Sequence, residues 1–206
     1  MPTLNAPFGL QPYRGGGSSA YALQTRRYFI PSSNGNAFYI GSPVKFAATG
    51  DADGTPGIDV AAGTDTFCGA VVSIEPANVG GISQVGSNLN LEQVSIPASK
   101  TRDYYVYVAD DPNQVFEIQG DATATNQVLA NSNKCASMTI TAPSPASFPT
   151  SATVLNSSTI ATNNTLNLKL LGLSPRPEAN RKGFGAYAVW LVKINLHQLA
   201  NGATGV

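Results

Sequence analysis

Short apolar stretches recur along the chain from about residue 28, and turn-forming residues separate them. In 165–170 leucines alternate with polar residues, and in 188–195 every second residue is apolar, as a strand with one buried face requires. The stretch 104–109 is apolar on both faces, which predicts a central strand. The predicted strands lie at 28–30, 37–40, 44–46, 58–60, 67–74, 104–109, 115–119, 137–141, 165–170 and 188–195.

About ten short strands joined by Gly- and Pro-containing turns predict an all-β fold, because such sheets must bury one face against another. We expect a jelly-roll-like β-sandwich or barrel of antiparallel strands. Within 67–74, the period of two places Cys68, Ala70, Val72 and Ile74 on one face. Helix signals are sparse, and they predict one short helix at 121–130 with Asp121 as its N-cap.

Residues 1–27 are predicted to form an extended N-terminal arm. Prolines and a run of three glycines disfavour regular structure there. Phe8, Leu10 and Tyr13 are apolar anchors within the arm, suited to lying across a neighbouring subunit or across the chain's own body. Residues 28–206 are then one β domain. A long loop insertion is expected near 131–158, where Ser, Thr, Ala and Pro are frequent and charge is low.

The low and balanced charge limits the classes of partner. The chain has 12 basic and 12 acidic residues, and charged residues are only 12% of the total. Nucleic acids and anionic membranes attract clustered Lys and Arg, so neither is an expected partner. A weakly charged surface suits protein contacts, because interface cores are depleted of charge. No apolar run approaches the about 20 residues of a membrane span, and the first residues lack a secretory signal, so we expect synthesis in a cytoplasm.

Few residues offer chemistry. His197 is the only histidine, and its apolar neighbours favour a packing role. Cys68 and Cys135 are predicted to be buried, unreactive thiols, with a disulfide left open. No metal or cofactor is expected, since a structural zinc site usually needs four His or Cys ligands. The turn from Asp51 to Asp53 begins like a calcium loop but lacks its final Glu, and whether it binds an ion stays open.

Two further patterns bear on carbohydrate chemistry. Asp110, Asp111 and Glu117 could supply the paired acids of a glycosidase, but a surface turn explains the two aspartates without that role. The aromatic run of Tyr104, Tyr105 and Tyr107 could form a glycan-binding platform, although a buried strand explains it better. We therefore predict that the protein is not an enzyme.

Several segments, taken in order, resemble the capsid cement proteins of tailed bacteriophages, also called decoration or head-stabilising proteins, which are encoded beside the major capsid gene. The resemblance is weakest in 78–100 and 132–158. The similar segments are 5–12, 40–44, 69–76, 107–112, 115–119, 168–173 and 190–198.

The resemblance implies a jelly-roll-like protein that binds the outer surface of a phage capsid, bridges neighbouring major capsid subunits and stabilises the head. Such a protein is located on the virion, and we expect it to associate with itself as a dimer or trimer. The family supplies no catalytic residues. The alternative is a glycan-binding β-sandwich module of a phage tail or adhesion structure. The residues we expect to contact the partner are Phe8, Leu10, Tyr13, Arg26, Arg27, Arg176 and Arg181.

Overall fold

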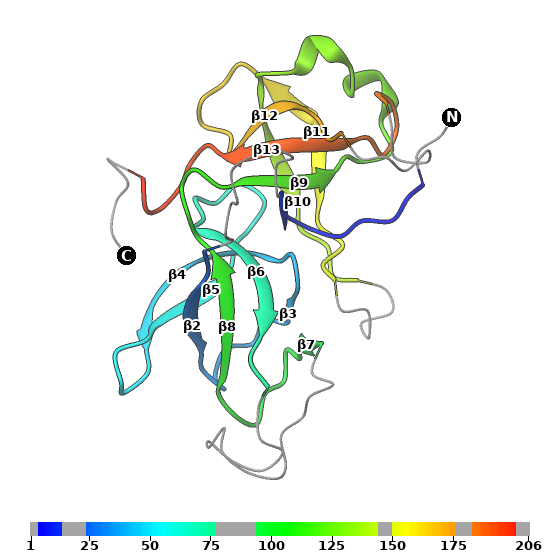
Figure 1. Cartoon of the computed structure of the whole chain (residues 1–206). Coiled ribbons are helices and arrows are strands. Elements are labelled where there is room, and N and C mark those ends of the chain that lie inside the picture. Colours follow the sequence, from blue (N-terminus) through cyan, green and yellow to red (C-terminus); the bar gives the residue numbers. More distant parts are fainter. Residues whose placement is uncertain (1–3, 14–23, 77–93, 144–149, 176–182, 201–206) are drawn as a thin grey trace.

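The computed structural model describes residues 4–13, 24–76, 94–143, 150–175 and 183–200. Within these ranges the chain is built almost entirely of β-strands, so the predicted all-β sandwich/barrel class is confirmed. The strands form a closed barrel and a six-stranded sheet, with a small two-stranded sheet beside the barrel (Figure 1). No helix among the described residues is long and apolar enough to cross a membrane.

The closed barrel has the strand order β2-β5-β4-β6-β8. Its pairings are antiparallel except that β2 and β5 run parallel. Strand β8 lies between β2 and β6, as the two-sided apolar pattern of 104–109 predicts. The strands are β2 (Arg26–Ile30), β4 (Pro43–Gly50), β5 (Pro56–Val60), β6 (Gly69–Ile74) and β8 (Tyr104–Ala109), and the two-stranded sheet joins β3 (Phe38–Tyr39) to β7 (Ser95–Ile96).

The six-stranded sheet has the order β1-β9-β13-β12-β10-β11, and with its connecting turns we call it the sheet lobe. Strand β13 lies in mid-sheet, and its residues Trp190 and Val192 are fully buried, as the period of two predicts. The strands are β1 (Gln11–Pro12), β9 (Val115–Gln119), β10 (Cys135–Thr139), β11 (Val154–Ala161), β12 (Leu168–Leu173) and β13 (Val189–Ile194).

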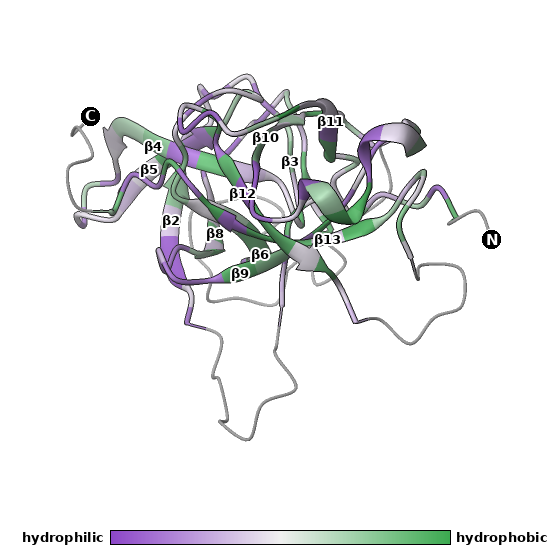
Figure 2. Ribbon diagram, turned by 90° about the horizontal axis from the view of Figure 1, so that it is seen from above, coloured by the Kyte–Doolittle hydropathy of each residue, from purple (hydrophilic) through white to green (hydrophobic). Residues whose placement is uncertain are grey.

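One hydrophobic cluster joins the barrel to the sheet lobe. It contains Phe116, Trp190 and Val192 from the sheet, and also Phe67, Ala70 and Ala109 from the barrel side. Figure 2 shows hydrophobic residues, in green, along strands of both parts, including β6, β9, β12 and β13. A second cluster fills the barrel itself. Because one core is shared, the two parts pack as neighbouring layers of one body.

Three local expectations were wrong. The segment 121–130 forms two short 3₁₀ turns, η1 (Ala124–Asn126) and η2 (Leu129–Asn131), and Thr123 is the N-cap residue of η1. The side chain of Asp121 instead accepts hydrogen bonds from Ser157 in the neighbouring strand. Within 131–158 the expected strand 137–141 is present as β10, but the rest of the range is not all loop, because the start of β11 also lies in it and pairs with β10.

The third expectation was a single apolar face in 67–74. The register of β6 against β8 shifts between Val71 and Ser73, which marks a β-bulge. A bulge adds one residue and changes which side chains share a face. Ala70 and Val72 pack against the core shared with the sheet and Val71 packs in the barrel core, as alternation requires. Ile74, beyond the shift, and Cys68, which precedes β6, also pack in the barrel core, so the four predicted residues do not share one face.

Candidate partner-binding surface

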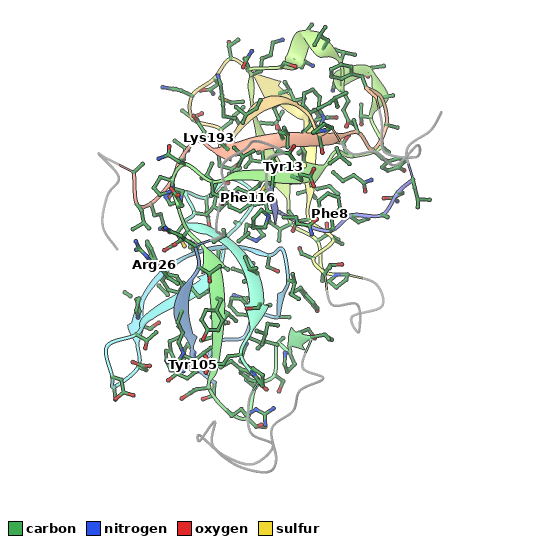
Figure 3. The ribbon with its side chains drawn as sticks, in the orientation of Figure 1. Phe8, Tyr13, Arg26, Tyr105, Phe116 and Lys193 are labelled. Atoms are coloured by element: carbon green, nitrogen blue, oxygen red, sulfur yellow. The ribbon has the colours of Figure 1, made fainter. Side chains whose placement is uncertain are left out.

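The N-terminal arm is packed on the chain's own body from Leu4 to Tyr13. Its strand β1 adds to the edge of β9, and the amide of Tyr13 donates to the carbonyl of Val115 at 2.8 Å. Leu10 is completely buried in the shared core, so it has no surface to offer, and the prediction that it contacts a partner was wrong. Phe8 and Tyr13 are half-buried and keep part of their surface accessible (Figure 3).

A crossing of two backbones fixes this arm. The amide of Leu10 donates to the carbonyl of Gly41 at 2.9 Å. Gly9 has φ 73° and Gly41 has φ 83°, a region where side chains cause strain. A Cβ on Gly9 would lie 2.8 Å from the carbonyl carbon of Gly41, and one on Gly41 would collide with the carbonyl oxygen of Phe8. Only glycine therefore fits on both sides of the crossing.

The two arginines of β2 differ in how exposed their side chains are and in how they are paired within the chain. The side chain of Arg27 forms an ion pair with Glu75 at 2.7 Å, and its guanidinium stacks on the ring of Tyr105 at 3.5 Å. The hydrogen bond that Arg27 donates to Glu75 raises the pKa of Arg27. Arg26 is 68% exposed and lies 3.5 Å from Asp110, a contact that leaves it available to a partner. Arg176 and Arg181 lie outside the described residues.

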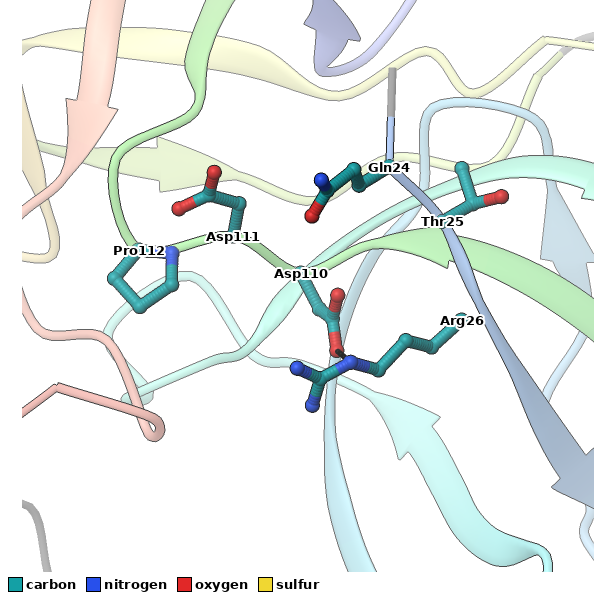
Figure 4. A pocket seen from close by; sticks show the side chains of 6 residues that line it. All are labelled: Gln24, Thr25, Arg26, Asp110, Asp111 and Pro112. Atoms are coloured by element: carbon teal, nitrogen blue, oxygen red, sulfur yellow. Dashed lines mark ion pairs between the residues drawn. The ribbon is translucent and has the colours of Figure 1, made fainter. Parts of the chain in front are cut away.

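An open hollow of about 600 Å³ lies beside Arg26, at the turn between β8 and β9 (Figure 4). It is lined by Gln24, Thr25, Arg26, Asp110, Asp111 and Pro112. Asp110 is buried, and it accepts a hydrogen bond of 2.6 Å from the hydroxyl of Tyr28. Glu117 does not line this hollow; it is buried on β9, where it accepts a hydrogen bond from Ser174. The three acids therefore do not form a pair across one cleft.

The remaining reactive side chains are buried and engaged within the chain. The thiol of Cys68 donates to the carbonyl of Val44 at 3.3 Å, and burial raises its pKa. Cys68 and Cys135 are both free and buried, as predicted. Nδ1 of His197 accepts from the amide of Leu199 at 3.0 Å, and burial lowers the pKa of the ring. Cys68 and His197 therefore contribute to the internal packing of the chain.

The carboxylate of Asp51 accepts hydrogen bonds from groups of the chain itself. The side chain of Asp51 accepts from the amides of Asp53 and Thr55, and from the hydroxyl of Tyr105 at 2.9 Å. Burial opposes ionisation of this carboxyl, but the hydrogen bonds outweigh it and the pKa of Asp51 is lowered. Over the described ranges, no group of three or more His, Cys, Asp and Glu side chains could hold a metal ion.

The tyrosines of β8 do not form an open platform. Tyr104 points into the barrel core and is buried, while Tyr105 and Tyr107 lie on the outer face and are half-buried. The guanidinium of Arg27 covers the ring of Tyr105, and the ring of Phe29 lies 5.6 Å from it. A sugar stacking on Tyr105 would therefore have to displace Arg27.

Exposed apolar side chains gather on the sheet lobe, a feature that the sequence patterns did not reveal. Leu129 is 71% exposed, and Val128, Phe184 and Leu171 also exceed a third. The amide of Gly185 donates to the carbonyl of Gln127 at 3.0 Å, so the two backbone segments that carry Phe184 and Val128 are joined. We call Val128, Leu129 and Phe184 the apolar rim. Clustered apolar residues on a surface are typical of protein contacts.

The total charge is balanced, but acidic and basic residues are unevenly distributed along the sequence. Residues 26–111, which form the barrel, contain nine acidic and five basic residues. Residues 112–206, which form most of the sheet lobe, contain three acidic and six basic residues. Counting the charges by halves of the sequence would have found this polarity.

Comparison with protein-family models, with curated proteins and with solved structures gives no match for this chain.

Proposed function

We propose that this protein is a structural component of a tailed-phage virion, which binds the outer surface of the capsid, bridges neighbouring major capsid subunits and stabilises the head. Binding to the assembled shell stabilises that state by mass action. Several weak contacts made by one rigid body add through effective concentration. In this proposal the protein is not an enzyme and needs no cofactor.

The apolar rim is the observation that carries the proposal. Leu129 and Phe184 are large apolar side chains, 71% and 41% exposed, on a chain in which only 12% of the residues are charged. Water contact with such side chains costs free energy, and a protein partner that covers them removes this cost. The packing of residues 4–13 of the arm on the body supports the same reading, because a segment that is already ordered loses little entropy on binding.

A binding experiment with phage heads tests the proposal. The purified protein is mixed with heads from which the native protein has been removed, and bound protein is measured by cosedimentation. Burying one large apolar side chain contributes about 1.5–3 kcal/mol, and each 1.4 kcal/mol is about tenfold in affinity. Leu129→Glu combined with Phe184→Glu should therefore weaken binding by at least about tenfold.

Val94→Glu is the matched control. Val94 is 42% exposed but lies beside the barrel, next to β7, so this variant should bind heads like the wild type. Equal binding by both variants would remove the apolar rim from the proposal. No binding by the wild type, together with recognition of sugars on a glycan array, would favour the alternative of a glycan-binding module.

A further inference from the structure

The outer face of the six-stranded sheet carries a pair of adjacent lysines. Lys169 on β12 stands directly opposite Lys193 on β13, so both side chains project from the same face (Figure 3 labels Lys193). Like charges directly opposite each other destabilise a sheet. Lys193 donates to Asn113 at 3.1 Å, but neither lysine pairs with a carboxylate among the residues that the structure describes.

Apolar side chains lie beside this lysine pair. Leu191 lies two residues before Lys193 on β13, and Leu171 lies two residues after Lys169 on β12 and is 38% exposed. We call Lys169, Lys193, Leu171 and Leu191 the lysine face. It combines positive charge with accessible apolar surface, so the surface that would fit it is acidic.

The far end of the barrel offers such an acidic surface. Asp51 and Asp53 lie in the turn between β4 and β5, and the hydroxyl of Tyr105 at the start of β8 bonds to Asp51 at 2.9 Å. Asp103 precedes the same strand and is exposed, as is Asp53. We call Asp51, Asp53 and Asp103 the acidic tip. Strand β8 runs from this tip toward the sheet lobe, so the tip and the lysine face belong to opposite ends of the molecule (Figure 1).

We propose that copies of this chain associate head to tail, with the lysine face of one copy against the acidic tip of the next. A contact between two lysine faces, or between two acidic tips, would set like charges against each other, and charge repulsion disfavours both. A head-to-tail contact pairs opposite charges at every interface. Such contacts close into rings or continue as chains. The proposal does not depend on capsid binding.

Sedimentation velocity on the purified full chain tests this proposal. The protein should associate with rising concentration at about 50 mM salt, and the association should disappear at about 500 mM because salt screens the attraction. The variant Lys169→Glu/Lys193→Glu should weaken association at low salt by at least about tenfold, and Asp53→Lys/Asp103→Lys should do the same. A wild type that stays monomeric at low salt overturns the proposal.

Mixing the two variants provides the decisive measurement. The first variant then presents acidic surfaces at both ends and the second presents basic ones, so the mixture should recover association that neither variant shows alone. Recovery also demonstrates that both variants are folded. A mixture that stays monomeric overturns the proposal.

A matched pair of variants separates the lysine face from total charge. Lys169→Gln/Lys193→Gln and Ala122→Glu/Thr125→Glu change the net charge equally. Ala122 and Thr125 are exposed in the turns before β10. Only the lysine variant should weaken association, and equal weakening by both would overturn the assignment to the lysine face.

Discussion

Replacing Gly9 with alanine tests how the arm is held to the body. At φ 73° an alanine costs about 1–2 kcal/mol of backbone strain. The added Cβ would also lie 2.8 Å from the carbonyl carbon of Gly41 and 2.9 Å from Cβ of Ser151. Relieving such overpacking costs about 1–3 kcal/mol. The free energy of unfolding should therefore fall by about 2–5 kcal/mol.

The loss of unfolding free energy caused by Gly9→Ala has an upper limit, because the arm can detach while the rest of the body stays folded. Detachment exposes Leu10, and removing a buried leucine costs about 2–5 kcal/mol. Urea unfolding followed by circular dichroism measures the change in stability. Limited chymotrypsin digestion reports whether Phe8 and Tyr13 have become accessible.

Gly54→Ala is the matched control for this experiment. Gly54 has φ 89°, but nothing lies within 4 Å of a Cβ placed there. Its replacement should cost only the backbone strain, about 1–2 kcal/mol, and leave the arm protected. Equal losses in the two variants, with equally protected arms, would refute the view that the crossing of Gly9 and Gly41 fixes the arm.

Three further predictions concern buried groups. Tyr28→Phe removes the hydroxyl that donates to buried Asp110 at 2.6 Å, and urea unfolding should show a loss of about 1.5–3 kcal/mol; an unchanged midpoint would contradict this. The buried ring of His197 has a lowered pKa, so below about pH 6.5 the unfolded chain binds the extra proton and stability falls as the pH drops. His197→Gln should reduce the fall in melting temperature between pH 7 and pH 5. An unchanged dependence of melting temperature on pH would contradict the prediction that the ring of His197 causes this fall. Cys68 and Cys135 are both buried, so they should react with a thiol reagent only after denaturation; rapid labelling of the native protein would show that they are accessible.

The positions of most strands could be predicted from the sequence, because the alternation of apolar and polar residues indicates which side chains are buried. The pattern of 188–195 predicted the central strand β13, and the two-sided apolar run 104–109 predicted β8 between two neighbours. The single face predicted for 67–74 failed at Ile74, because the register shift before it depends on pairing with β8, and at Cys68, which precedes β6. Strand β11 was missed because its Ser- and Thr-rich sequence looks like a loop, although pairing with β10 satisfies its backbone.

The candidate surfaces were less predictable than the fold. Leu10 was chosen as a partner contact because an apolar residue in a Pro-rich arm suggests a free anchor, yet its long-range packing places it in the core. Leu129 was assigned to a helix, whereas a short 3₁₀ turn exposes it. The lysine face depends on Lys169 and Lys193 lying opposite each other, and only the strand register shows this.

Two segments that carried the resemblance meet in the structure. Gly9 belongs to 5–12 and Gly41 belongs to 40–44, and their backbones cross where the arm is pinned. A sequence comparison by segments gives no reason to connect them. Their contact explains why both segments need glycine at these positions.

Electron cryo-microscopy of phage heads incubated with the purified protein would test the central claim most directly. The account predicts density for the chain on the outside of the shell, in contact with at least two major capsid subunits, with Leu129 and Phe184 of the apolar rim facing the shell. Bare heads at saturating protein, or density found only on the tail or inside the shell, would contradict it.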